Sequence, residues 1–88
     1  MKIKKISEDL NWPTKGGKLY KSFEFKNFKE ALDFINQVGQ VSEIVNHHPE
    51  IRNIYNKVEL YIITHDSSKI TEKDHNLAEK IDKIYNKL

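Results

Sequence analysis

Apolar and polar residues alternate along residues 19–25, where Leu19, Phe23 and Phe25 share one face of an extended chain. This period of two predicts a half-buried strand. The paired glycines Gly16 and Gly17 predict a tight turn just before it, because glycine readily adopts the positive φ angles of short hairpin loops. The short segment that contains Trp12 is therefore expected to pair with this strand across the turn.

Two further strands are predicted at residues 50–56 and 57–65, joined by a hairpin turn at Asn56 and Lys57. The second strand carries apolar residues on both of its faces. One face has Val58, Leu60, Ile62 and Thr64, and the other has Glu59, Tyr61, Ile63 and His65. Apolar residues on the face turned away from the core predict contact with a partner subunit or a bound ligand.

Helical spacing marks two other segments. The first is expected to begin at the N-cap Asn27, with Glu30 completing a capping box, and to run to about Asn46, since Pro49 discourages continuation. Its apolar stripe comprises Ala31, Leu32, Ile35, Val38, Val41, Ile44 and Val45. The last helix is expected after Thr71, with Asp74 three residues on. Its stripe comprises Leu77, Ala78, Ile81, Ile84, Tyr85 and Leu88.

The order strand, strand, helix, strand, strand, helix predicts a single α+β domain over residues 1–88. We expect a four-stranded antiparallel sheet with the two main helices packed on one face. An 88-residue chain has little room for a second core.

Composition narrows the classes of function. The chain has no cysteine, which excludes disulfides, zinc–thiolate sites and thiol nucleophiles. Lysines are spread along a chain of net charge +2, so no direct nucleic-acid binding is expected. Apolar runs fall short of the about 20 residues that span a bilayer, and the N-terminus has no signal-peptide core. We therefore expect a cytoplasmic protein without membrane contact.

Three of the four histidines fall within residues 46–66, which makes this stretch the candidate site. Glu43 and His47 are four residues apart, so on a helix they can hydrogen-bond, which would fix the imidazole tautomer and favour the protonated ring. His48 follows directly. His65 ends a strand, and Asp74 is placed in sequence to orient His65 or its loop, unless it is only a helix cap.

Other interpretations of these residues stay open. Three imidazoles and a carboxylate match a zinc ligand set, although adjacent histidines rarely direct both rings at one tetrahedral centre. The pair His47–His48 could be a surface feature, and His75 is expected to be one. Trp12 is more often a core residue than a ligand platform.

The same residues resemble the pterin-4a-carbinolamine dehydratases over about residues 12–85. The resemblance rests on Glu43-x-x-x-His47-His48-Pro49, Tyr55-Asn56-Lys57-Val58, Thr64-His65 and Thr71-x-x-Asp74, with Trp12, "FEFKNFKEA" and "NLAEKID" in support. It implies an enzyme that dehydrates 4a-hydroxytetrahydrobiopterin to quinonoid dihydrobiopterin during tetrahydrobiopterin recycling. It also implies a homodimer or homotetramer that needs neither cofactor nor metal.

The resemblance further implies the roles of individual residues. His47, His48 and His65 would be catalytic, and Glu43 and Asp74 would orient them. The substrate contacts would be Pro49, Thr64, Asp66, Ser67 and Trp12. Loss of water from C4a needs a base for the N5 proton and an acid for the hydroxyl, and imidazoles suit both tasks. The sequence leaves open which histidine does which.

Two features depart from the family pattern. The loop "DSSKIT" lacks the glycine common after Thr-His, and only a short segment precedes Trp12, where "ISEDL" would be a remnant of the family's N-terminal helix or an irregular arm. Two alternative functions remain. One is a non-catalytic dimerisation or coactivator-type module, as in animal members of the family, and the other is related chemistry on a molybdopterin-type pterin.

Overall fold

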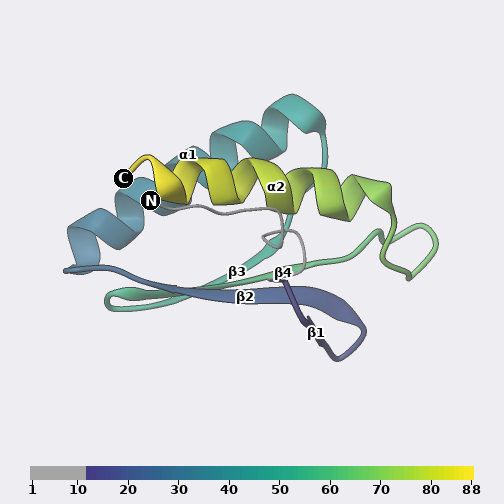
Figure 1. The fold of residues 1–88 in the computed structure, drawn as a ribbon, viewed down its shortest axis with the longest axis horizontal. Helices are drawn as coiled ribbons and strands as arrows, with labels where there is room; N and C mark the ends of the chain where they lie inside the picture. Colours follow the sequence, from purple (N-terminus) through teal and green to yellow (C-terminus); the bar gives the residue numbers. More distant parts are fainter. Residues whose placement is uncertain (1–11) are drawn as a thin grey trace.

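The four strands form one antiparallel sheet, and both helices lie on the same face of it (Figure 1). The computed structural model describes residues 12–88. In chain order the elements are β1 (Thr14–Lys15), β2 (Lys18–Glu24), α1 (Phe28–Val45), β3 (Glu50–Ile54), β4 (Lys57–Ile62) and α2 (Glu72–Asn86). The sheet order is β1-β2-β4-β3. The predicted α+β class and element order are confirmed. The expectation for "ISEDL" lies outside the described residues.

The core lies between the sheet and the two helices. Phe34 of α1 is completely buried and its ring lies 4.9 Å from that of Phe23, 5.0 Å from that of Phe25 and 6.0 Å from that of Tyr85. Leu60 and the other inward residues of β4 close the core from below. Aromatic side chains from both helices and the sheet therefore fix how the layers pack.

Side chains cap both helices at the predicted N-cap residues, but the capping box predicted for α1 does not form, because the Glu30 carboxylate accepts from the Lys26 N–H at 3.2 Å and not from the Asn27 N–H. Asn27 accepts a 2.9 Å hydrogen bond from the Glu30 N–H at the start of α1. At the start of α2, Thr71 accepts from the Lys73 N–H at 3.2 Å, while the Asp74 carboxylate accepts from the Thr71 N–H at 2.7 Å. This capping box places Asp74 at the end of α2 that faces the candidate site.

The structure corrects the predicted apolar stripe of α1. Leu32 and Ile44 are 41% and 81% exposed, whereas Phe34 and Ser42 are buried. The buried face is therefore centred on Phe34 and Val38, and the predicted stripe was too wide. Burial leaves the Ser42 hydroxyl with a hydrogen-bond partner, because it donates to the Val38 carbonyl oxygen at 2.7 Å.

The β3–β4 hairpin turns one residue earlier than predicted. Tyr55 and Asn56 form the turn, with a positive φ of 52° at Tyr55, and Lys57 already belongs to β4, where it pairs with Ile54.

The apolar residues on the outer face of the sheet are also less exposed than expected. Tyr61 is only 9% exposed, because its ring lies 4.9 Å from that of Tyr20 and because the Arg52 guanidinium lies 5.0 Å above it.

Candidate active site

His47 leaves α1 at a sharply defined helix end. Asn46 adopts the left-handed conformation with φ 55°, and the His47 N–H donates to the Ser42 carbonyl oxygen at 3.0 Å. This is the hydrogen-bond pattern of a Schellman motif, in which asparagine is a common alternative to glycine. The turn directs the His47 side chain toward α2, where its Nε2 lies 2.6 Å from Asp74 Oδ1.

Asp74 is the most fully enclosed charged group of the site. Its side chain is 0% exposed, and besides His47 it accepts hydrogen bonds from the Thr71 N–H at 2.7 Å and from the Thr64 hydroxyl at 2.8 Å. Burial raises the pKa of this carboxyl, but the hydrogen bonds from His47, Thr71 and Thr64 together outweigh burial and hold the pKa below its ordinary value. Asp74 is therefore a carboxylate near neutral pH.

An ionised Asp74 determines the tautomer of His47. A carboxylate only accepts hydrogen bonds, so the imidazole must place a proton on Nε2, which donates to Asp74. In the neutral ring Nδ1 then carries the lone pair and can take up a proton from another molecule. Since the His47 side chain is only 12% exposed, this orientation is held by packing as well as by the hydrogen bond.

His48 has a different partner and a different environment. Its Nε2 lies 2.5 Å from Glu43 Oε2, and the two side chains are 53% and 78% exposed. The predicted pairing of Glu43 with His47 is therefore wrong. Because Asn46 turns out of the helix, His47 no longer lies one helical turn above Glu43, and His48 comes into reach instead. The prediction that Asp74 orients His65 or its loop is also wrong, because Asp74 forms its hydrogen bond with His47.

His65 lies on a tight loop after β4, which ends at Ile62, and not at the end of the strand as predicted. Thr64 and Lys69 form an isolated bridge, and the Ser68 N–H donates to the His65 carbonyl oxygen at 3.2 Å, which closes the loop. The loop and the end of α1 enclose a hollow of about 290 Å³, called here the histidine hollow. Its lining residues are Asn46, His47, His48, Thr64, His65, Asp66 and Lys73. All three predicted catalytic histidines thus line one hollow.

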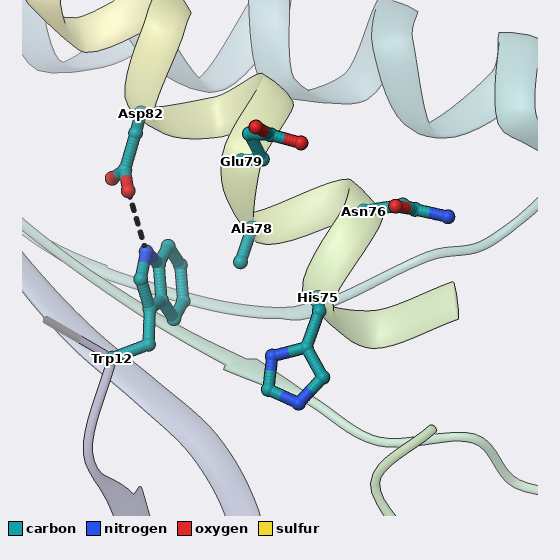
Figure 2. A pocket seen from close by; sticks show the side chains of 6 residues that line it. All are labelled: Trp12, His75, Asn76, Ala78, Glu79 and Asp82. Atoms are coloured by element: carbon teal, nitrogen blue, oxygen red, sulfur yellow. Dashed lines mark hydrogen bonds between the residues drawn. The ribbon is translucent and has the colours of Figure 1, made fainter. Parts of the chain in front are cut away.

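Of the predicted substrate contacts, Thr64 and Asp66 line the histidine hollow, whereas Pro49, Ser67 and Trp12 do not. Pro49 and Ser67 lie next to lining residues in sequence but are not part of its wall. Trp12 is buried elsewhere, and its indole N–H donates to Asp82 at 3.0 Å (Figure 2). It borders a separate hollow of about 210 Å³ on another side of α2, together with His75. The structure thus gives Trp12 the core role that the sequence left open, and sets His75 apart from the other histidines.

Two lining residues were missed from the sequence, Asn46 and Lys73. An asparagine between an apolar stripe and a proline is a recognisable helix C-terminal signal, so Asn46 could have been found. Lys73 lies in the first turn of α2 beside the predicted capping residue Asp74, and no feature of its own sequence context marks it.

Within residues 12–88 no group of three or more histidine and carboxylate side chains is arranged to share a metal ion. His47 and His48 each direct Nε2 at a different carboxylate, Asp74 and Glu43 respectively. Neither described helix is long and apolar enough to cross a membrane.

Comparison with known proteins identifies the family to which the chain is similar. The sequence profile of the family "Pterin 4 alpha carbinolamine dehydratase" matches residues 1–84. A protein of Sulfurisphaera tokodaii, provisionally named a pterin-4-alpha-carbinolamine dehydratase, is 44% identical over 85 residues, covering 92% of this chain and 91% of that protein. A similarly named protein of Prochlorococcus marinus is 43% identical, covering 92% of this chain and 85% of its own length.

Among solved structures, the chain is similar to a transcriptional coactivator/pterin dehydratase from Brucella melitensis, with a TM-score of 0.79 and 33% identity over 89% of each chain. The α+β fold is thus shared with a protein of this type. The chain belongs to the pterin 4 alpha carbinolamine dehydratase family.

Proposed function

We propose that the protein dehydrates 4a-hydroxytetrahydrobiopterin to quinonoid dihydrobiopterin and water, as a step in the recycling of tetrahydrobiopterin. The observation that carries the proposal is the pairing of His47 with the buried carboxylate Asp74 at the wall of the histidine hollow. Family membership supports the class of reaction. The buried pair supports the assignment of acid–base roles, since a base must be oriented before it can act.

The proposed chemistry requires one proton to leave N5 and one to reach the departing hydroxyl. His47 is assigned as the base, because Asp74 holds the proton of the neutral ring on Nε2 and leaves Nδ1 to accept the N5 proton. The electron pair of the N5–H bond forms the C4a–N5 double bond as the C4a–O bond breaks. The electron pair of the C4a–O bond leaves with the hydroxide, so the reaction is a dehydration without net oxidation or reduction.

The departing hydroxide needs a proton from a second group. His48 and His65 are both exposed at the rim of the histidine hollow, where they can exchange protons with water. Glu43 Oε2 lies 2.5 Å from His48 Nε2, so this carboxylate accepts a hydrogen bond from the ring and orients it. In this proposal His48 or His65 donates the proton that turns the hydroxide into water, while Thr64, with its hydroxyl on Asp74, keeps the carboxylate in place.

The direct test is to generate a 4a-hydroxytetrahydropterin in the presence of the protein and to follow its dehydration by absorbance. We expect a rate well above that in buffer, saturating with substrate. A rate equal to the rate in buffer, with protein shown to be folded by circular dichroism, would remove the enzymatic function.

Self-association is part of the proposal. The edge strand β3 exposes Ile51 and Ile54, which are 37% and 75% accessible, and α1 exposes Phe28 and Leu32, which are 45% and 41% accessible. Exposed apolar side chains on an edge strand and on one helix face are typical of interfaces between subunits. We expect a homodimer or homotetramer in sedimentation experiments, and a monomer at micromolar concentration would contradict this.

The second candidate function is a coactivator-type binding module. It is favoured by one observation, the name of the Brucella melitensis structure, which joins a coactivator and a dehydratase. This function predicts a stable oligomer without turnover. Measurable dehydration that is lost on substitution of His47 would separate the two, because a binding module has no need for a positioned base.

A further inference from the structure

A second hollow of about 450 Å³ adjoins the histidine hollow. The two hollows share Asn46, His47 and Lys73 as common wall. The remaining wall of the second hollow consists of Val45, Asn76, Leu77 and Lys80. We call it the lysine hollow. The two hollows therefore lie side by side around His47.

One stripe of α2 forms most of the lysine hollow. Lys73, Asn76, Leu77 and Lys80 follow the spacing of residues on a single helix face. Leu77 is completely buried and gives an apolar floor, to which Val45 at the end of α1 contributes from the other side. The two lysines are exposed, so their ammonium groups reach the solvent side of the hollow.

Among residues 12–88 the charged side chains that line the lysine hollow are of one sign. Apart from His47, the ionisable lining residues in this part of the chain are Lys73 and Lys80, and none of them is a carboxylate. Within residues 12–88 neither lysine forms an ion pair. The histidine hollow, in contrast, contains Asp66 in its wall. Two lysines without local counter-charges beside an apolar floor form a site for an anionic group attached to a less polar stem.

The chemistry of the substrate connects the two hollows. In a pterin, C6 is bonded directly to N5, the atom whose proton is removed. If His47 takes the N5 proton, the substituent on C6 must begin beside His47, which is one of the three residues that line both hollows. The pterin ring system would occupy the histidine hollow, and the C6 side chain would run into the lysine hollow.

We propose that the lysine hollow binds the C6 side chain of the pterin and selects substrates in which this side chain carries an anionic group, a phosphate or a carboxylate. This inference rests on the proposed function and narrows its substrate: the reaction at C4a and N5 is unchanged. The neutral dihydroxypropyl chain of biopterin makes no use of Lys73 and Lys80, so an acidic side chain is preferred over it.

The test compares two ligands that differ only in an anionic phosphate group, 6-hydroxymethyl-7,8-dihydropterin and its phosphate ester. Dissociation constants are measured by titration calorimetry for the unaltered protein and for Lys80→Gln, Lys73→Gln and the double variant. We expect the phosphate ester to bind about tenfold more tightly than the neutral pterin, the scale of one hydrogen bond to a charged group. Each substitution should reduce this preference severalfold, and the double variant should abolish it.

Lys83→Gln is the matched control, because Lys83 is an exposed lysine of the same helix that lines neither hollow. It removes the same net charge and should keep the preference. Equal affinity for the two ligands in the unaltered protein, or an equal loss of preference in Lys83→Gln and Lys80→Gln, would overturn the selection.

The outcomes also separate this inference from the function on which it rests. Equal binding of both ligands together with intact dehydration would overturn the lysine hollow alone. Failure of both ligands to bind, together with no dehydration, would overturn the proposed function and the lysine hollow with it. A preference that persists unchanged in the double variant would show that the anion binds elsewhere.

Discussion

Replacing Asp74 by asparagine removes one charge at nearly constant shape, and so tests the buried pair directly. Asp74 accepts bonds of 2.6, 2.7 and 2.8 Å from His47, Thr71 and Thr64 while fully buried. Hydrogen bonds to a charged acceptor contribute about 1.5–3 kcal/mol each, compared with about 1 for a neutral one, and an unmatched buried donor costs about 1–3. Summed over the three donors, Asp74→Asn should lower the free energy of unfolding by about 3 kcal/mol.

For a domain of this size, that loss corresponds to a fall of about 15 °C in Tm. The pH dependence carries the same information. The pKa of Asp74 lies below its ordinary value of 3.8 in the folded protein, so its contribution is present above that value and is lost as the pH falls through the lower, folded pKa. The difference in stability between the unaltered protein and Asp74→Asn should be constant from pH 7 to about pH 4 and shrink below it.

Activity should fall more steeply than stability. If the asparagine amide N–H faces Nε2 of His47, the imidazole proton moves to Nδ1 and the base loses its lone pair at the reacting side. We expect kcat to fall about 100-fold or more, measured at a temperature where circular dichroism shows the variant folded. Asp33→Asn is the control, because Asp33 is 56% exposed and, among residues 12–88, pairs with Lys29 alone, at 3.4 Å. The reasoning would be refuted if Asp74→Asn had a free energy of unfolding within 1 kcal/mol, and a kcat within threefold, of those of the unaltered protein.

Three shorter predictions concern the fold around the site. Trp12→Phe should lower the free energy of unfolding by about 2 kcal/mol in urea, since the buried hydrogen bond to Asp82 is lost. It should leave kcat/KM within twofold. A tenfold loss of kcat/KM would show instead that Trp12 contacts the substrate. Phe34→Ala should cost about 4 kcal/mol, and a cost below 1 would contradict its central place in the core. Asn46→Ala should cost about 1 kcal/mol in thermal unfolding and slow the reaction, whereas Asn46→Gly should do neither; equal stability of the two variants would contradict the left-handed helix end.

The sequence could predict the architecture because local signals agreed with the fold. Asn27 and Thr71 are strong N-caps, the strands alternate, and glycines mark the first turn, so element order and sheet type followed from short-range rules. The histidines could be gathered in one place on the family resemblance, and Asp74 could be named before its partner was known.

The partners within the site could not be predicted, because they depend on one backbone angle. Because Asn46 has a φ of 55°, His47 no longer follows the helical spacing. Glu43 therefore forms a hydrogen bond with His48, and His47 forms one with Asp74. The place of Trp12 likewise depends on a residue 70 positions away, Asp82, which no local pattern connects to it. The cytoplasmic location and the oligomeric state stay predictions.

The central claim is that the three imidazoles of the histidine hollow carry out the reaction, and the dehydration rates of four single histidine variants test it most directly. We expect His47→Ala to lower kcat/KM about 100-fold or more, and His48→Ala and His65→Ala to lower it about tenfold. His75→Ala, which removes the imidazole beside Trp12, should keep the rate of the unaltered protein. An effect below threefold at His47, or an equal loss at His75, would contradict the account.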